Sequence, residues 1–288
     1  MAFKFDEIGF SFKTGGYSSR SESGNSAGVG YCLNWKFLNA SVLGTSHQKT
    51  DLPCQDECII DSVKDAFGNE VLIAVVSDGA GSAKHANQAS ETTCSTLFTV
   101  LEKAITSVKE VSSFSFEDAV SWLQNVRSRL KEMAIEQENS ESLREYACTV
   151  VAAIVSEKST VFFQVGDGAV VIGDGESFAP VFWPENGEFP NETAFLTDDD
   201  FTQHIQFLSS KESPREIALF SDGLQRLALR FGDKTAHTPF FSPMFKRLRL
   251  ENPGISDILN KQLAEFLNSP GVNERTDDDK TLILASCM

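Results

Sequence analysis

The stretch Val75-Val76-Ser77-Asp78-Gly79 places an aspartate at the end of an apolar run and directly before a glycine. The same arrangement returns at Leu219-Phe220-Ser221-Asp222-Gly223, and an apolar run beginning at Thr281 follows Asp278. Short apolar runs bounded by turn residues are typical of buried strands. A carboxylate delivered by such a strand is costly to bury unless a counter-charge compensates it. The pattern therefore predicts a shared pocket, and oxygen ligands favour Mg²⁺, Mn²⁺ or Ca²⁺ over Zn²⁺ in it.

The composition is that of an acidic globular protein. The chain has 288 residues, of which 41% are hydrophobic, and a formal net charge of −16 at pH 7. This charge repels phosphate backbones and anionic lipids, so we expect neither nucleic acid nor a membrane as a partner. No apolar run approaches the ~20 residues of a membrane span, and the first residues lack the pattern of a signal peptide. Six cysteines without a framework spacing fit a reduced compartment, which predicts a cytoplasmic location.

The chain is expected to contain an N-terminal arm and one domain. Residues 11–30 are rich in Ser and Gly, which favours a flexible arm over an ordered edge loop and gives an expected arm of residues 1–30. Residues 31–288 carry no linker or internal repeat and are expected to form the domain. Its strand-like runs occur in clusters on either side of two helical stretches. This order favours a layered α+β domain over alternating βαβ units.

The periodicity predicts the individual elements. The stretch 116–137 carries apolar residues at three- to four-residue steps, as an amphipathic helix does. Glycines on both sides of Asp167 predict a hairpin between the strands that flank them, and the three acids at 198–200 predict a solvated turn. The expected helices are 86–108, 116–137 and 255–268, and the expected strands are 36–45, 70–77, 148–155, 160–165, 169–172, 191–197, 216–221 and 281–285.

Five aspartates lie at expected strand ends or tight turns. A single Asp-Gly pair indicates little, because this dipeptide is common in turns. Several such acids tied to apolar strands are a stronger signal, since two cations held close together polarise a water into a nucleophile near neutral pH. The pattern therefore indicates a metal site for phosphoryl chemistry. The five candidates are Asp56, Asp78, Asp167, Asp222 and Asp278.

These motifs occur in a fixed order along most of the chain. They are Gln55-Asp56, Val75 to Gly81, Val165 to Gly168, Leu219 to Gly223 and Asp278 to Thr281. The ordered set resembles the metal-dependent serine/threonine protein phosphatases, also called protein phosphatase 2C-like. Gly44-Thr45-Ser46-His47, followed by Pro53-Cys54-Gln55-Asp56, is similar to a bacterial branch of that family. The resemblance implies a four-layer α-β-β-α sandwich, in which helical pairs flank a central antiparallel β-sandwich with the metals in a cleft at one end.

The resemblance also implies roles for individual residues, with Mn²⁺ or Mg²⁺ as the cofactor. Asp78 would bridge two ions, and the carbonyl of Gly79 would bind the second. Asp222 and Asp278 would complete the shell of the first ion, and Asp56 would hold a metal-bound water. The expected metal-binding residues are Asp56, Asp78, Gly79, Asp167, Asp222 and Asp278, and the expected catalytic residues are Asp56 and His47.

Several positions depart from or extend the family pattern. Asp167 matches a position that, with Asp222, can hold a weaker third ion. Asp279 stands where the family usually has Asn. The family's Arg before the first acid is absent, and that stretch offers His47 and Lys49 instead. Ala80 replaces the His that commonly follows the Asp-Gly pair. An imidazole can donate a proton or bind phosphate near neutral pH, so His47 and His85 are the alternative candidates for these two roles.

The function expected from the sequence is hydrolysis of phosphoserine or phosphothreonine on proteins through a water activated by two metals. It implies a phosphorylated protein substrate and a cognate serine/threonine kinase. The absent Arg and Ala80 motivate an alternative, a phosphatase-like regulatory binding module with weak or no catalysis. A phosphodiesterase or nuclease would also use the carboxylates, but it needs a basic groove. A zinc site at Cys54 and Cys58 with His47 lacks a fourth ligand.

Overall fold

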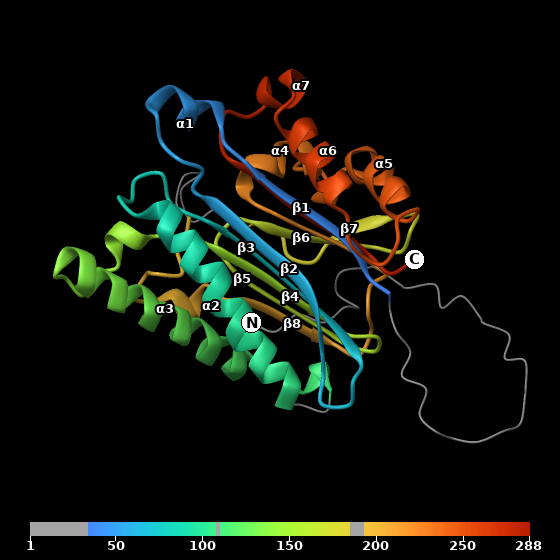
Figure 1. Ribbon diagram of the computed structural model, residues 1–288, viewed down its shortest axis with the longest axis horizontal. Helices are drawn as coiled ribbons and strands as arrows, with labels where there is room; N and C mark the ends of the chain where they lie inside the picture. The colour runs from blue at the N-terminus through green and yellow to red at the C-terminus, as the bar shows by residue number, and fades with distance from the viewer. Residues whose placement is uncertain (1–33, 108–109, 185–192) are drawn as a thin grey trace, which may run out of the picture.

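Two β-sheets lie against each other, and helices cover the outer face of each sheet (Figure 1). The computed structural model describes residues 34–107, 110–184 and 193–288. The expected N-terminal arm, residues 1–30, lies outside the described residues. The expectation of a mixed α+β fold is confirmed.

Antiparallel pairing holds the first sheet together throughout. It has five strands in the order β2 (Asp56–Lys64), β3 (Glu70–Asp78), β4 (Val150–Val155), β5 (Thr160–Val165) and β8 (Gln206–Ser210). Helices α2 (Ala86–Ser107) and α3 (Phe116–Glu138) run side by side over its outer face (Figure 1).

The second sheet has six strands and is antiparallel except at one edge, where β12 runs parallel to β1. Its order is β12 (Gly254–Ile255), β1 (Lys36–Val42), β13 (Lys280–Ser286), β9 (Glu216–Phe220), β6 (Ala169–Gly173) and β7 (Phe178–Pro180). Its outer face carries α5 (Thr238–Leu248) and α6 (Asp257–Leu267) (Figure 1). The shorter elements are α1 (Thr45–Thr50), α4 (Gln225–Ala228), α7 (Pro270–Asn273) and the β10 (Leu229–Arg230)–β11 (Thr235–Ala236) hairpin.

Three hydrophobic clusters fill the spaces between these elements. Alternation along β3 shows how one strand serves two of them. Ile73 and Val75 face α2 and α3, whereas Leu72 and Ala74 face the other sheet. Because side chains alternate across a strand, a strand buried on both faces must be apolar throughout. This explains the continuous apolar run that precedes Asp78.

The predicted hairpin around Asp167 is wrong. β5 pairs with β4 and β8 in the first sheet, whereas β6 pairs with β7 and β9 in the second, so the chain crosses between the sheets at 166–168. Gly166 has φ 106°, a conformation that glycine adopts without strain. A Cβ at Gly168 would lie 2.5 Å from Cγ2 of Val151. The two glycines therefore permit a tight crossing between sheets, which the sequence pattern does not distinguish from a hairpin turn.

Other expected elements agree with the structure to within a few residues. The strand expected at 36–45 ends earlier, at Val42, because α1 begins at Thr45. The strand expected at 191–197 is not present in its described part, 193–197, and residues 191–192 lie outside the described residues. The acids at 198–200 do form a turn. None of the helices in the described ranges combines the length and apolarity needed to span a membrane.

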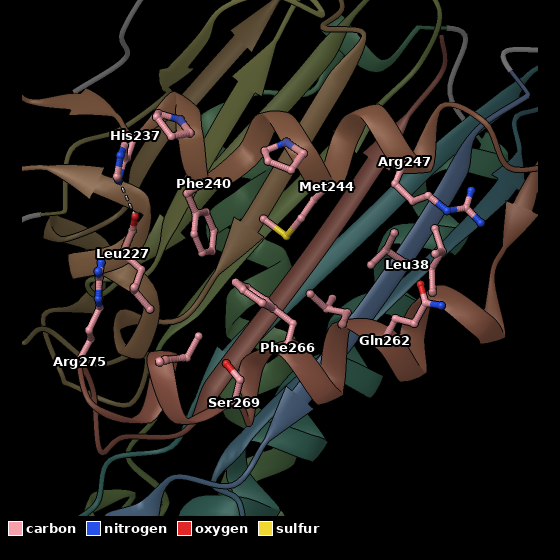
Figure 2. A pocket seen from close by; sticks show the side chains of 16 residues that line it. Leu38, Leu227, His237, Phe240, Met244, Arg247, Gln262, Phe266, Ser269 and Arg275 are labelled. Carbon is pink, nitrogen blue, oxygen red and sulfur yellow. Dashed lines mark hydrogen bonds between the residues drawn. The ribbon is translucent and has the colours of Figure 1, made fainter.

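A groove of about 560 Å³ separates α5 from α6 (Figure 2). Phe240 and Met244 of α5 face Phe266 of α6 across it, Leu263 also lines it, and Arg275 stands at one end. None of the five candidate aspartates lines this groove. The carboxylates belong to a different part of the molecule, at one end of the two sheets.

Candidate metal centre

The first sheet contributes two of the acids from neighbouring strands. Asp56 begins β2 and Asp78 ends β3, and the two residues lie directly opposite each other in the antiparallel register. Directly opposed residues have Cα atoms ~4.5–5.5 Å apart. Asp56 is 5% exposed. The strands that bury the core therefore place two carboxylates side by side at the end of the sheet.

The second sheet contributes two more acids at the same end of the molecule. Asp222 follows β9, and Asp278 precedes β13. Because β9 and β13 are antiparallel neighbours, the two acids lie at the same end of these strands. Asp167 lies in the crossing between the sheets. A cavity of about 390 Å³ is lined by four of the candidate acids together with the expected backbone ligand and His47; these residues are Asp78, Asp167, Asp222, Asp278, Gly79 and His47.

The electrostatics of the cavity disfavour charged carboxylates. Burial raises the pKa of Asp78 well above its usual value, and the nearby charges of Asp56 and Asp222 raise it further. Burial likewise raises the pKa of Asp56 to about 7 and the pKa of Asp222 to about 6. The pKa values of Asp167 and Asp278 are also raised, again mainly by burial. Ionising these acids therefore costs more free energy in the folded chain than in water, and a bound cation would offset that cost.

The donor set fits a hard divalent cation. Oδ1 of Asp56 and Oδ1 of Asp222 are buried and have no hydrogen-bond partner. Oδ2 of Asp56 accepts a hydrogen bond of 2.6 Å from Oγ of Ser221, which leaves Oδ1 as the free atom. Unpaired buried carboxylate oxygens are the ligands that Mg²⁺ and Mn²⁺ prefer. In the described ranges, no three His, Cys, Asp or Glu side chains lie in the geometry of a complete ligand group.

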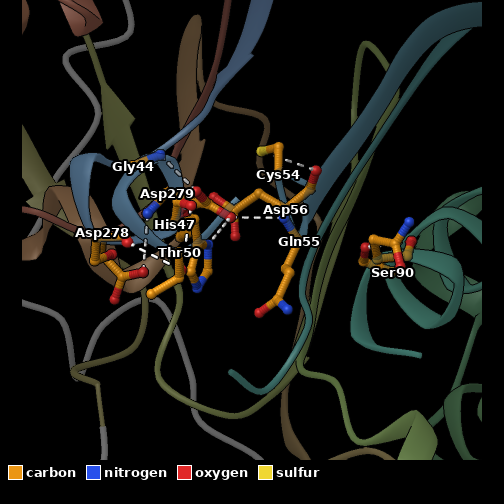
Figure 3. Close-up of polar contacts among 12 residues, drawn as sticks. Gly44, His47, Thr50, Cys54, Gln55, Asp56, Ser90, Asp278 and Asp279 are labelled. Carbon is orange, nitrogen blue, oxygen red and sulfur yellow. Dashed lines mark hydrogen bonds and ion pairs between the residues drawn. The ribbon is translucent and has the colours of Figure 1, made fainter. Parts of the chain in front are cut away.

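Asp279 joins three loops beneath the cavity (Figure 3). Its Oδ1 accepts the backbone N–H of Gly44 at 2.6 Å, and its Oδ2 accepts the backbone N–H of Gln55 at 2.6 Å. Oδ2 also lies 3.0 Å from Nδ1 of His47. The side chain of Asp279 is 2% exposed. The residue that the sequence marks only as a replacement for Asn is therefore the connector between the start of α1, the entry to β2 and the entry to β13.

The two histidines differ in what they face. His47 is 14% exposed and lines the cavity, and its contact with Asp279 leaves Nε2 directed away from that contact. His85 instead places Nε2 2.6 Å from Oε1 of Glu138 and stacks on Tyr146 with ring centroids 4.8 Å apart. His85 does not line the cavity. Of the two, only His47 is positioned to meet a substrate in the cavity.

The zinc alternative finds no support in the described residues. The thiol of Cys58 is buried between the sheets, where it contacts Asn39 and Ser41, and Cys54 contacts the backbone of Asp56. Both are free cysteines. His47 contacts Asp279 instead. Cys54, Cys58 and His47 therefore do not point to a common position where an ion could bind.

A side chain at Gly223 would push against the backbone of the candidate metal centre. A Cβ there would lie 2.0 Å from the carbonyl oxygen of Asp279, which is backbone and has little freedom to move. We expect Gly223→Ala to lower the free energy of unfolding by ~1–3 kcal/mol, the usual cost of overpacking, and to reduce activity. Urea denaturation measures the first effect. Gly232→Ala is the control, because no atom lies within 4 Å of a Cβ at Gly232; equal midpoints for the two variants would contradict the prediction.

Comparison with known proteins identifies the family. The protein phosphatase 2C family matches residues 43–268. Serine/threonine-protein phosphatase 3 of Escherichia coli (strain K12) is 34% identical over 255 residues, which cover 88% of this chain and 98% of the relative. The chain therefore belongs to the protein phosphatase 2C family of metal-dependent enzymes and is a serine/threonine protein phosphatase.

Solved structures share the fold at lower identity. The phosphatase Stp1 from Staphylococcus aureus superposes with a TM-score of 0.53 at 18% identity, covering 92% of this chain and 99% of Stp1. A structure of RsbX in complex with magnesium has a TM-score of 0.50 at 12% identity, covering 88% of this chain and 94% of RsbX. These two similarities concern the arrangement of sheets and helices alone.

Proposed function

We propose that this enzyme hydrolyses phosphoserine and phosphothreonine on proteins with two Mn²⁺ or Mg²⁺ ions held at the end of the two sheets. Asp78 lies between the acids of both sheets and would bridge the ions, with the carbonyl of Gly79 on the second. Asp222 and Asp278 would complete the ligand set of the first ion. The observation that carries the proposal is the convergence of acids from both sheets, two of which, Asp56 and Asp222, have a buried oxygen without a hydrogen-bond partner. The magnesium bound by RsbX supports the kind of ion.

The bound ions would neutralise the phosphoryl oxygens and lower the pKa of a water, so that water can attack phosphorus near neutral pH. The chain's own contribution is orientation. Asp56 is fixed through Ser221, whose Oγ donates to Asp56 and accepts the backbone N–H of Thr281 at 3.1 Å. The free Oδ1 of Asp56 would accept a hydrogen bond from the attacking water. Asp167 and Asp222 face the same cavity and would hold a weaker third ion.

His47 would protonate the departing serine or threonine oxygen. With its Nδ1–H donating to Asp279, its Nε2 faces the cavity and can carry a proton to the leaving group when the ring is protonated. Ala80 also lines the cavity and offers no titratable group there. The imidazole of His47 would therefore take the proton-donating role of the histidine that family members commonly have at the position of Ala80.

The alternatives differ in what they require. A regulatory module has no need for unpaired buried carboxylates, which cost stability without supplying a contact. A nuclease needs a basic groove, whereas acids dominate the lining of this cavity. The three hydrophobic clusters support the four-layer α-β-β-α arrangement on which the metal cleft depends. The cytoplasmic location and the cognate kinase stay predictions; five free cysteines in the described residues fit a reduced compartment.

Metal-dependent hydrolysis of a phosphoserine peptide and of p-nitrophenyl phosphate tests the proposal. The parent should turn over both substrates with Mn²⁺ and lose activity with a chelator. Asp78→Ala and Asp222→Ala should each reduce kcat/KM by about 100-fold or more, because each removes a metal ligand and its transition-state charge stabilisation. Asp199→Ala is the control, since Asp199 is fully exposed outside the cavity. Parent-like activity in the Asp78 and Asp222 variants would refute the proposed site.

A further inference from the structure

We propose that Arg226 and Arg275 bind acidic side chains that flank the phosphorylated residue, so that the enzyme prefers phosphoproteins with Asp or Glu beside the site. This inference rests on the proposed function and names the substrate class for the same cleft. It concerns a second cavity that opens beside the carboxylates, on the side of α4 and the loop before β13.

This second cavity, of about 550 Å³, is continuous with the first. The two share Asp167, Asp222 and Asp278 in their linings. Arg226 and Arg275 also line the second cavity. A peptide whose phosphoryl group lies among the aspartates of the first cavity would therefore extend its neighbouring residues past these two side chains.

Local structure fixes the two arginines relative to the metal-binding acids. Arg226 lies on α4, one helical turn after Asp222. Nε2 of Gln225, the first residue of α4, donates to the carbonyl of Asp167 at 2.5 Å and holds α4 against the cleft. Arg275 lies three residues before Asp278. Each guanidinium is thus close in sequence to a candidate ligand, yet neither occupies a ligand position.

Both guanidinium groups are available to a ligand. Arg226 and Arg275 are both exposed, and in the described part of the chain neither makes an ion pair or a side-chain hydrogen bond. By contrast, Arg230 pairs with Asp233 at 3.5 Å, and Arg249 donates to Glu216 at 2.8 Å. A guanidinium carries five N–H donors in a planar fork, which matches a carboxylate or phosphate in bidentate geometry.

The arrangement favours contact with flanking residues over contact with the reacting phosphoryl group. Asp78 and Gly79 line the first cavity, and neither arginine does. The arginines line the adjoining cavity, which would take the residues that flank the phosphoryl group. Asp277 is the one acid in this lining that is not an expected metal ligand, so with the ions in place two guanidinium charges face one carboxylate. The local field there attracts an anion on an otherwise acidic protein.

Matched phosphopeptides test this inference. One series carries Asp or Glu at single positions on either side of phosphoserine, and the reference peptide carries Ala at those positions. We expect kcat/KM of the parent to be about three- to tenfold higher for the best acidic peptide, the size of one or two exposed ion pairs. The double variant Arg226→Gln/Arg275→Gln should bring the ratio close to one. Arg275→Glu should reverse it, so that a Lys-flanked peptide becomes the better substrate.

Control reactions separate this inference from the proposed function. Hydrolysis of p-nitrophenyl phosphate has no flanking residues and should stay within about twofold of the parent in all these variants, which also shows that they are folded. Arg230→Gln, an exposed arginine outside both cavities, should keep the acidic preference. A parent without any acidic preference, a double variant that retains it, or an equal loss on p-nitrophenyl phosphate would overturn the inference. If the parent fails to hydrolyse p-nitrophenyl phosphate with Mn²⁺, the proposed function itself fails.

Discussion

An Asp78→Asn variant is expected to lose about two orders of magnitude or more in phosphatase activity and to be more stable than the parent when metal is absent. The loss of activity follows from the central position of Asp78, which faces acids from both sheets. The gain in stability follows from the same position. Removing one charge relieves repulsion among carboxylates whose pKa values are already raised by burial and by one another.

The pH dependence gives this prediction a sign. Folding raises the pKa of Asp56 from its ordinary value of 3.8, which applies in the unfolded chain, to about 7. The folded state therefore binds the proton more tightly than the unfolded state does. A group whose pKa is raised by folding makes the metal-free protein less stable as the pH rises from about 4 to about 7. The decline should be steeper for the parent than for Asp78→Asn, because the pKa of Asp78 is itself raised by burial and by Asp56 and Asp222, and the variant lacks this titrating carboxyl group.

Thermal denaturation with a chelator and with Mn²⁺ measures these effects. At pH 8 the parent should gain Tm when Mn²⁺ is added, since an ion that binds only the folded state stabilises it by mass action. Asp78→Asn should start from a higher Tm in the chelator and gain little from Mn²⁺. Asp199→Asn serves as the charge-matched control and should behave as the parent does. A variant that is less stable than the parent without metal would show that Asp78 is held by contacts within the protein instead of by cations.

Asp279→Ala is expected to destabilise the protein strongly, by ~3–5 kcal/mol, and to abolish activity. The substitution leaves the buried backbone N–H groups of Gly44 and Gln55 without an acceptor, and loss of a buried charged partner has this magnitude. Activity should fall even at temperatures where the variant is folded, because the same carboxylate orients His47.

A comparison of two further variants separates these roles. Asp279→Asn retains one acceptor oxygen but places an amide N–H₂ toward at least one of the same donors, so its stability should lie between those of the parent and Asp279→Ala. His47→Ala should keep near-parent stability while lowering kcat on a phosphoserine peptide. Urea denaturation and steady-state kinetics check both statements, with Asp199→Ala, at an exposed position outside both cavities, as control. If Asp279→Ala is as stable as the parent, Asp279 does not stabilise the fold by connecting Gly44 and Gln55.

The sequence was sufficient for the strands that deliver acids and insufficient for how the chain passes between them. The apolar run before Asp78 is continuous because β3 is buried on both faces, so its strand and its terminal acid could be predicted. The glycines around Asp167 serve a crossing between sheets, yet local turn chemistry is the same for a hairpin.

The parts of the site made by long-range contacts were the least predictable. Asp279 meets Gly44 and Gln55, residues more than 220 positions away, and only the assembled fold shows that it has three partners. Its signal in the sequence was slight: an acid directly before a buried strand. Arg226 and Arg275 carried no motif at all, because their meaning depends on the cavity that they line.

The place of β13 in the second sheet links the completion of that sheet to the completion of the candidate site. β13 follows every other described strand in the chain, yet it lies in the interior of its sheet, between β1 and β9. The second sheet therefore cannot reach its final strand order until β13 has been synthesised. Because Asp278 and Asp279 directly precede that strand, a chain too short to contain β13 also lacks one of the expected metal ligands and the residue that connects Gly44 to Gln55.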